Sequence, residues 1–376
     1  MWYSPRALTS EPTPLDPPDA PPKLAWQGRA RSLAPKLAAS LLIAFGIFWV
    51  LRWGGLPMFP PWSAFRLLSW WALPGYVILY VFITFLRTYR WIYLLEPIQR
   101  ELSPRRVFGI GLVGFGAIMF APMRMGEVVR PWLLAQDGRV SLVEGASTVV
   151  AERIIDGLTL TLLLMVSLSL ATPLSPLPER VGKLPLPVAA VPAAASGALL
   201  VFAAAFLAMA LFYFWRDAAR RAVHAVVGVF SQRLAHWLTM QVERLADGLR
   251  FLPSGRHGGA FLRDTLMYWA LSALSTTLLL RGCGAPAGLL EGCVTMGIMG
   301  IGTLIPGGPG FFGTYQLAAY CALAMFFPEP MILSSGALFT FVSYMVHVVM
   351  TALSCLLGAW LMASADRTGT LRRAPS

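Results

Sequence analysis

Two short stretches of the sequence place acidic and basic residues beside apolar runs. One is PMRMGEVVRPWLL at 122–134, and the other is AERIID at 151–156. The six candidate residues are Arg124, Glu127, Arg130, Glu152, Arg153 and Asp156. The first three fall near one helical face, and Glu152 and Asp156 lie one helical turn apart. Such spacing could pair the charges with each other and leave guanidinium groups to bind a phosphate through two hydrogen bonds.

These charged residues are predicted to lie at membrane depth, which is why their pattern indicates a site. A charge inside a membrane helix costs about 3 kcal/mol unless it is paired or hydrated, so intramembrane acids are rare and usually functional. Apolar turns begin directly after Asp156. We therefore predict that these residues form a substrate-binding site for an anionic head group. For Arg139 and Glu144 we expect only interfacial charge.

A third stretch, IPGGPGFFGTYQ at 305–316, interrupts the apolar sequence near its carboxyl end. Its prolines and glycines do not continue a helix, and irregular backbone at membrane depth is tolerated where it lines a cavity or is buried in protein. We predict that it lines the same cavity, with Tyr315 among the substrate-binding residues. The residues predicted to form gates or re-entrant turns are Gly126, Pro131, Pro306, Gly307, Gly308 and Gly310.

Other motifs favour packing over chemistry. Gly109, Gly111 and Gly114 match G-x-G-x-x-G, but no strand precedes them, so we expect close helix packing and no dinucleotide site. His347 shares a predicted helical face with Tyr344. We interpret it as a packed, hydrogen-bonded histidine rather than as part of a proton relay. There is no Ser/His/Asp set, phosphate loop or metal-ligand spacing. We expect no cofactor, no metal and no enzymatic activity.

The composition is that of a membrane protein. Of 376 residues, 57% are hydrophobic and only 13% are charged, where soluble domains average about a quarter charged. The net charge of +12 need not indicate nucleic acid, because inner-membrane proteins carry excess cations in their cytoplasmic loops. We expect the bacterial inner membrane as the location, lipid as the partner, and no nucleic acid.

Apolar runs define the elements that must position the site. The runs are 37–53, 70–86, 107–121, 142–172, 188–215, 265–280, 287–305, 311–327 and 331–362. They predict an all-α polytopic membrane protein. We expect residues 1–36 to be a disordered cytoplasmic tail, 37–362 a single transmembrane domain and 363–376 a second cytoplasmic tail. The arginine-rich segment 216–263 has helical apolar spacing and is predicted to lie on the cytoplasmic face.

Charge placement suggests a topology with two halves. Both termini and residues 216–263 are assigned to the cytoplasm by the positive-inside rule, which leaves outside only Arg52, Arg66, Arg180, Lys183 and Arg281. The glycine-rich runs then enter and leave on one side, which predicts about six full spans plus two re-entrant hairpins. Residues 37–172 and 188–362 would be inverted repeats. Alternatively, 287–305 and 311–327 each span, giving eight to nine apolar helices.

The three motifs together resemble the lysylphosphatidylglycerol synthase flippase-like transmembrane family. They are R-x-G-E-x-x-R-P from Arg124, E-R-x-x-D from Glu152 and P-G-G-x-G from Pro306. The resemblance covers about residues 37–362 and implies a membrane domain with re-entrant helices that handles lipid. The aminoacyl-transferase domain of full-length synthases has no counterpart in these 376 residues. Gly313 and Thr314 stand where many members carry an acidic residue.

Three functional hypotheses remain open at this point. The first is translocation of a lipid or lipid-linked substrate, which we expect to be anionic, across the bilayer. The second is a lipid-modifying membrane enzyme in which Glu152 and Asp156 act as acid–base or metal-binding groups. The third is a non-transporting assembly factor that docks partners on residues 216–263.

Overall fold

The computed structural model describes residues 26–371, apart from 100, 122–125, 137, 230, 248–254 and 306–307. The α-helices are α1 (Trp26–Trp53), α2 (Ala72–Tyr89), α3 (Trp91–Leu95), α4 (Pro104–Phe120), α5 (Val129–Ala135), α6 (Leu142–Leu170), α7 (Val191–Phe214), α8 (Arg216–Val226), α9 (Gln232–Asp247), α10 (Gly255–Gly282), α11 (Leu289–Gly302), α12 (Thr314–Ala324), α13 (Glu329–Met331) and α14 (Ala337–Leu371). Short 3₁₀ helices are η1 (Trp62–Leu67), η3 (Val188–Ala190) and η4 (Pro309–Phe311), and η5 (Ile332–Gly336) is a π-helical turn. The predicted all-α fold is confirmed.

The small amount of sheet lies in one surface loop. Strands β1 (Arg180–Val181) and β2 (Leu184–Pro185) pair antiparallel, with Val181 opposite Leu184. The loop is tied to the carboxyl end of α1, because the Lys183 amide donates to the Gly54 carbonyl at 2.8 Å. This contact joins the start of the first half of the chain to the connection between the halves.

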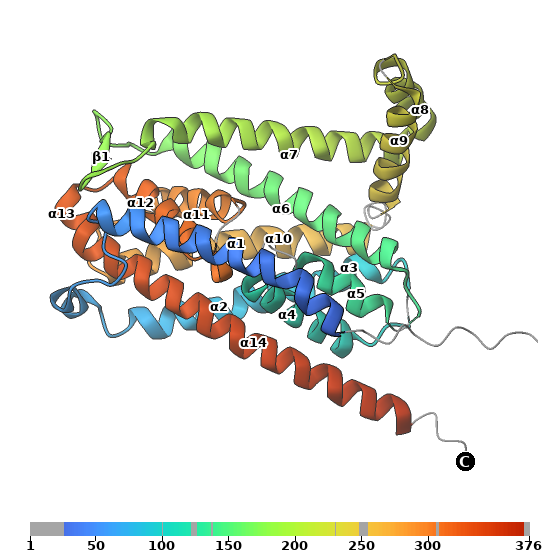
Figure 1. The fold of residues 1–376 in the computed structure, drawn as a ribbon, viewed down its shortest axis with the longest axis horizontal. Coiled ribbons are helices and arrows are strands. Elements are labelled where there is room, and N and C mark those ends of the chain that lie inside the picture. The colour runs from blue at the N-terminus through green and yellow to red at the C-terminus, as the bar shows by residue number, and fades with distance from the viewer. Residues whose placement is uncertain are drawn as a thin grey trace, which may run out of the picture.

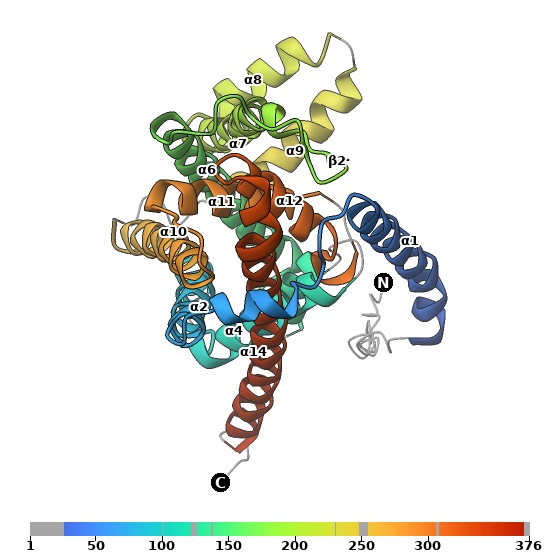
Figure 2. The same cartoon turned by 90° about the vertical axis from the view of Figure 1, so that its left-hand side faces the viewer.

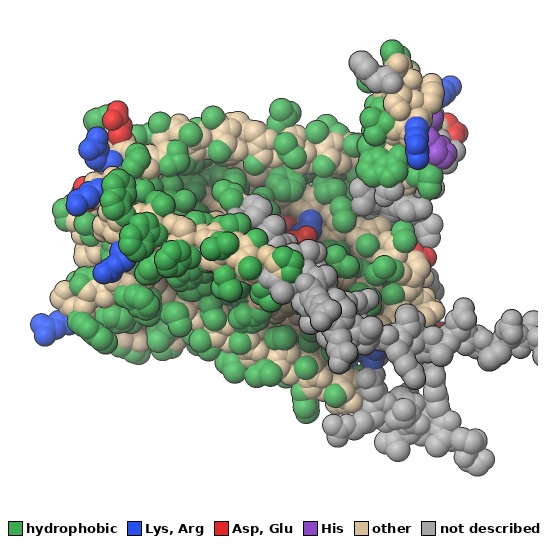
Figure 3. All heavy atoms as spheres, in the orientation of Figure 1, with side chains coloured by type: hydrophobic (Ala, Val, Ile, Leu, Met, Phe, Trp, Pro, Cys, Tyr) green, Lys and Arg blue, Asp and Glu red, His purple; other side chains and the backbone are tan. Residues whose placement is uncertain are grey.

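The long helices have the dimensions of membrane spans. Among the described residues, three helical stretches are long and apolar enough to cross a bilayer: Ala72–Leu95, Val188–Leu211 and Glu329–Ala365. Helices α6 and α10 have 29 and 28 residues, and both carry charges toward their amino-terminal ends. Figure 3 shows apolar side chains covering the length of the molecule, with charged side chains gathered toward its two ends.

The carboxyl end of the described chain and the arginine-rich helices lie at the same end of the molecule. In Figure 1 the carboxyl end of α14 lies at the same end as α8 and α9, while β1 and α13 lie at the opposite end. Exposed tryptophans lie at both ends of the molecule. They are Trp62 and Trp70 near η1, and Trp215 and Trp237 near α8 and α9. Tryptophan is enriched at membrane–water interfaces, so these residues indicate where the hydrocarbon ends.

Two helical hairpins enter the fold from opposite ends. Helices α4 and α5 form the first, and α11 and α12 form the second. At 1.5 Å per residue, the 14 residues of α11 and the 11 of α12 reach only about 21 and 17 Å, short of a hydrocarbon core of about 30 Å. The lengths therefore favour the re-entrant hairpin over the alternative in which both segments span.

The packing of the two halves is reciprocal. The last long helix of each half packs against the hairpin of the other half, so α14 lies along α4 and α6 lies along α11. The second spans, α2 and α10, pack against each other. This exchange is the arrangement expected of inverted repeats, with the hairpins held between long helices (Figures 1 and 2).

Several helices extend beyond the apolar runs from which they were predicted. Helix α1 begins at Trp26, so residues 26–36 do not belong to an irregular tail. Residues 26–34 are free of proline, which allows the helix to extend toward the amino terminus. Helix α14 continues through Leu371, beyond the predicted end at 362. Residues 255–263, assigned to the amphipathic segment, form the first turns of α10.

The predicted packing role of the glycines in α4 agrees with the structure. A methyl group at Gly109 would lie 2.8 Å from the Gly358 carbonyl oxygen of α14, and one at Gly358 would lie 2.7 Å from the Gly109 carbonyl oxygen. The two helices therefore cross with their backbones in close approach. Small residues at such crossings are typical of membrane helix interfaces.

Gly358→Ala tests this crossing. Because the added methyl group meets backbone and not a flexible side chain, we expect destabilisation of about 1–3 kcal/mol, seen as a lower Tm in detergent. Gly197→Ala on α7 is the matched control, because a methyl group there meets nothing within 4 Å. Equal Tm values for the two variants would show that the crossing tolerates a larger residue.

Candidate functional site

A fully buried ion pair joins the first hairpin to α6. Arg130 on α5 donates to both carboxylate oxygens of Glu152 on α6, with Nη1–Oε1 at 3.2 Å and Nη2–Oε2 at 2.9 Å. Both side chains have 0% relative exposure. The Arg130 guanidinium also lies over the Trp91 ring, 4.2 Å from its centroid. This bidentate geometry fixes the orientation of both charged groups.

A second buried pair lies one turn further along α6. Arg90, between α2 and α3, donates from Nη2 to Asp156 Oδ2 at 2.5 Å and from Nη1 to Thr265 Oγ1 on α10 at 2.8 Å. Its Nη2 also lies 3.6 Å from Glu152 Oε1. Arg90 therefore connects the two acids and links α2 to both α6 and α10.

Local sequence explains how these groups reach one another. A capping box starts α6, because Ser141 Oγ accepts from the Glu144 amide and Glu144 Oε2 accepts from the Ser141 amide. Thr148, Glu152 and Asp156 then follow at intervals of four residues and share one helical face. Thr148 accepts a hydrogen bond from Trp91 Nε1 at 3.1 Å.

Gly114 supplies the space for the buried arginine. A methyl group at this position would lie 2.0 Å from Arg130 Cγ. The first hairpin is equally close at its tip, where a methyl group on Gly126 would lie 2.0 Å from the Ala117 carbonyl carbon. The glycine pattern of α4 thus serves both helix packing and placement of the ion pair.

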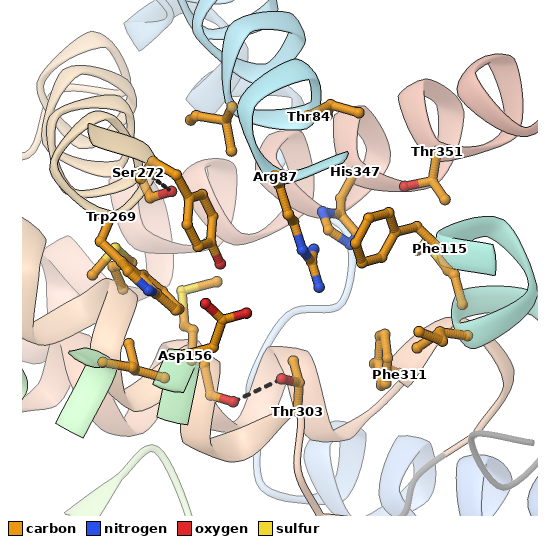
Figure 4. A pocket seen from close by; sticks show the side chains of 18 of the residues that line it. Thr84, Arg87, Phe115, Asp156, Trp269, Ser272, Thr303, Phe311, His347 and Thr351 are labelled. Atoms are coloured by element: carbon orange, nitrogen blue, oxygen red, sulfur yellow. Dashed lines mark hydrogen bonds between the residues drawn. The ribbon is translucent and has the colours of Figure 1, made fainter. Parts of the chain in front are cut away.

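Beside these pairs, a cavity of about 690 Å³ lies between the two halves of the chain. Its wall is built from α2, α4, α6, α10, α11 and α14, with residues from both hairpin tips. Figure 4 shows Arg87 from α2 and Asp156 from α6 pointing into this space. Figure 3 shows acidic and basic side chains within a hollow of the otherwise apolar face.

Two arginines of the cavity wall form no ion pair among the described residues. They are Arg87 and Arg153, whose guanidinium carbons lie 4.0 and 5.7 Å from the centroid of the Phe115 ring. Within the described part of the chain, Arg87 Nε and the Arg153 atoms Nε and Nη2 are buried without a hydrogen-bond partner. Arg130 lies against the same ring at 5.0 Å, but it is held by Glu152. Arg87 and Arg153 have spare donors and are therefore suited to hold an anion.

The structure divides the predicted substrate-binding residues into two groups. Glu127, Arg153, Asp156 and Tyr315 line the cavity. Arg130 and Glu152 are fully buried in their mutual pair, so their geometry fits a positioning role better than substrate contact. Arg124 lies outside the described residues.

The first stretch is not one continuous α-helix within the described residues. Residues 126–128 adopt a 3₁₀ turn and α5 begins at Val129. Glu127 lines the cavity, and Arg130 pairs with Glu152.

Of the predicted gate residues, Gly126, Gly308 and Gly310 lie in the turns of the two hairpins. Gly308 packs against Ala44 of α1, and Gly310 has a φ of 71°, which favours glycine. Pro131 lies buried in α5, where a methyl group added at Gly145 would lie 3.2 Å from it. Pro306 and Gly307 fall outside the described residues.

Sequence reasoning missed Arg87 and Arg90 as site residues. Both follow the apolar run 70–86 and satisfy the positive-inside rule, so they were assigned to the cytoplasmic loop. Helix α2 instead continues to Tyr89 and carries them beside α6. Their spacing of three residues at the end of an apolar helix was the available signal.

His347 is hydrogen-bonded, as predicted, but it also lines the cavity. Its Nδ1 lies 3.3 Å from Tyr80 Oη, and the same hydroxyl lies 2.9 Å from Thr351 Oγ1. Tyr315 stacks near it, with ring centroids 6.3 Å apart. No group of three or more His, Cys, Asp or Glu residues within the described ranges could hold a metal ion.

The fold and site define a polytopic membrane protein with a polar chamber between two packed halves. The model of the lysylphosphatidylglycerol synthase TM region matches residues 37–351, and the chain belongs to this family. Membership shows a function connected with membrane lipid. Comparison with curated proteins finds no match, and comparison with solved structures finds none either.

Glu152→Gln tests the buried pair. Removing one charge leaves the Arg130 guanidinium buried without its counter-ion, so we expect a loss of about 3–5 kcal/mol and a large drop in Tm in detergent. The control is Glu101→Gln, whose partner Arg139 is 3.9 Å away and whose side chain is 79% exposed. That change should cost less than about 1 kcal/mol.

The double variant Arg130→Met with Glu152→Met tests whether the loss of stability comes from leaving one charge unpaired. It removes both charges together, so we expect it to recover much of the stability lost in Glu152→Gln. If Glu152→Gln were as stable as Glu101→Gln, the pair would not contribute to the fold.

Proposed function

We propose that this chain translocates an anionic lipid, or a lipid-linked anionic substrate, across the bilayer. The observation that carries the proposal is the pair Arg87 and Arg153 in the wall of a cavity lying between the two halves of the chain. A phosphate entering the cavity would meet two guanidinium groups without carboxylate partners in the described chain. Arginine binds phosphate bidentately, so each can contribute two parallel hydrogen bonds.

The cavity also has the mixed character that a lipid head group requires. Its volume of about 690 Å³ falls within the range of small-molecule pockets, about 300–1,000 Å³. Leu160, Phe202 and Met299 are among its apolar lining residues, beside the charged ones. The polar part of a lipid would therefore find hydrogen-bond partners while the surroundings stay compatible with acyl chains.

The hairpins supply elements that could alternate access. Each hairpin tip contributes to the cavity wall, Glu127 from the first and Phe311 from the second. In transporters built from inverted repeats, such broken helices meet around the substrate near the midplane, and one half moves against the other. The proposal includes an inner-membrane location with both termini in the cytoplasm, supported by the charge distribution along the sequence.

An enzymatic role is the less favoured alternative. Glu152 accepts two hydrogen bonds from Arg130, and Asp156 Oδ2 accepts from Arg90. Carboxylates engaged by arginines are poorly suited to bind a divalent cation, because the guanidinium occupies the coordinating lone pairs. This arrangement supports binding without chemistry at the site.

The test is a translocation assay in proteoliposomes. Lipids labelled on the acyl chain with a dithionite-quenchable fluorophore report transfer between leaflets. Arg87→Gln and Arg153→Gln should each slow transfer of an anionic lipid by about 10- to 100-fold, the effect of losing a charge-assisted hydrogen bond. Arg66→Gln, an exposed arginine at the β1 end, is the matched control.

The contrary result is equally clear. If all three variants move lipid at the wild-type rate, Arg87 and Arg153 do not bind the substrate. If the wild-type protein moves no lipid faster than empty liposomes, translocation itself is wrong.

A further inference from the structure

His347 is the histidine of this sequence that lies outside the arginine-rich segment 216–263, among the apolar helices. That segment holds the other three, which are His224, His236 and His257. The side chain of His347, on α14, lines the cavity together with Tyr80 and Arg87 of α2. Histidine changes its charge near neutral pH, and an ionisable group at membrane depth that faces a cavity is typical of a proton or substrate pathway. Its place in the cavity wall therefore distinguishes His347 from a histidine that only packs.

Hydrogen bonds link His347 to two hydroxyl groups in the same wall. The Tyr80 hydroxyl lies 3.3 Å from His347 Nδ1 and 2.9 Å from Thr351 Oγ1. A hydroxyl both donates and accepts, and an imidazole nitrogen does one or the other according to its protonation. The direction of the two bonds can therefore reverse when the imidazole gains or loses a proton, and no heavy atom has to move.

His347 also lies where the two halves of the chain meet. Its ring is 5.6 Å from the Tyr80 ring of α2, in the first half, and 6.3 Å from the Tyr315 ring of α12, in the second hairpin. A change of charge at the imidazole therefore acts on side chains of both halves. A group that is to couple protonation to movement between the halves needs this position.

Arg87 exerts the main electrostatic effect on His347. Figure 4 shows the guanidinium beside the imidazole, with both side chains pointing into the open space. The part of α4 that lines the cavity is apolar. In the described chain, the other titratable groups are the neighbouring phenols Tyr80, Tyr315 and Tyr344 and, elsewhere in the wall, Tyr76, Glu127, Arg153, Asp156 and Tyr268.

This neighbour makes protonation of His347 depend on what the cavity holds. An imidazolium beside the Arg87 guanidinium is repelled when no anion is present, because like charges interact strongly away from water. An anion bound to Arg87 removes that repulsion and attracts the imidazolium. Binding of the anion and binding of a proton to His347 therefore favour each other, and the coupling is reciprocal.

Resting on the proposed function, we propose that His347 is a proton-binding site and that one proton crosses the membrane with each anionic substrate. The proton comes from water on one side, adds to an imidazole nitrogen to form an imidazolium, and returns to water on the other side when the anion leaves. A phosphodiester carries one negative charge, so the anion and the proton together carry no net charge. The membrane potential then neither drives nor opposes the transfer, and a proton gradient drives it.

Binding at two pH values is the first test, made with acyl-labelled phosphatidylmethanol and purified protein in detergent. The phosphodiester of this probe does not titrate between about pH 5.5 and 8, which bracket the ordinary histidine value of about 6.5. Because protonation of His347 favours the anion, fluorescence anisotropy should show affinity on the order of 10-fold higher at the lower pH. His347→Gln keeps a polar side chain that cannot charge, so it should lose this rise and retain the affinity measured at the higher pH.

His236→Gln is the matched control, because His236 is exposed on α9, and it should show the same rise as the wild-type protein. Equal affinity of the wild-type protein at both pH values would overturn the proton site. A rise that persists in His347→Gln would assign the proton to another group and overturn it as well.

A proton gradient across wild-type proteoliposomes tests coupled transfer without any variant. The lumen is made about one pH unit more acidic than the outside, the membrane potential is held at zero, and dithionite reports the labelled phosphatidylmethanol in the outer leaflet. Coupled transfer should enrich the probe in the outer leaflet at least about twofold, toward a limit of about tenfold set by the proton ratio. Protein-free liposomes with the same gradient should show no enrichment.

The two tests separate the possible failures. If the probe exchanges between leaflets but distributes equally under the gradient, coupled transfer is wrong and translocation stands. If the probe does not move at all, translocation is wrong, and a pH-dependent affinity that His347→Gln abolishes still supports the proton site.

Discussion

Pairing of charges away from water is the constraint on which this structure depends. Arg90, Arg130, Glu152 and Asp156 are all buried, and each acid is engaged by an arginine from another element. A single unpaired charge in such surroundings would cost several kcal/mol, so α2, α5 and α6 must keep their relative positions. These ion pairs hold α2, α5 and α6 together beside the cavity. In the cavity wall, they leave Arg87 and Arg153, which lie against Phe115, without a carboxylate partner in the described chain.

The reciprocal packing of the halves explains why the cavity exists where it does. The hairpin helices α4 and α11 are shorter than a hydrocarbon core of about 30 Å requires, and each packs along the last long helix of the other half. Close backbone approach at Gly109 and Gly358 makes one of these contacts possible. Where the two hairpins stop, neither half fills the space completely, and the cavity forms between α2, α6, α10 and α14.

The site combines a rigid part and a part open to ligand. The side chains of Glu152 and Arg130 are fully buried, and their role is to hold α5 against α6. Asp156 belongs to both parts, because one oxygen is bound by Arg90 and the other lacks a partner within the described chain. A binding group that is anchored on one side in this way presents its free atom in a fixed direction, which favours selectivity for head-group chemistry.

Hydropathy and charge along the sequence determined the membrane class, the helical runs, the two-ended distribution of charge and the importance of Glu152 and Asp156. These properties are local, or depend on periodicity, and so can be read from residue order. Which arginine pairs with which acid was decided only by tertiary structure. Arg87 and Arg90 read as loop cations until α2 brought them beside α6. Tertiary structure likewise placed Glu127 in the cavity wall and Arg130 in a buried pair with Glu152, although the two residues are three apart in the sequence. Residue order does not give these partners, because they depend on the packing of the whole hairpin against α6.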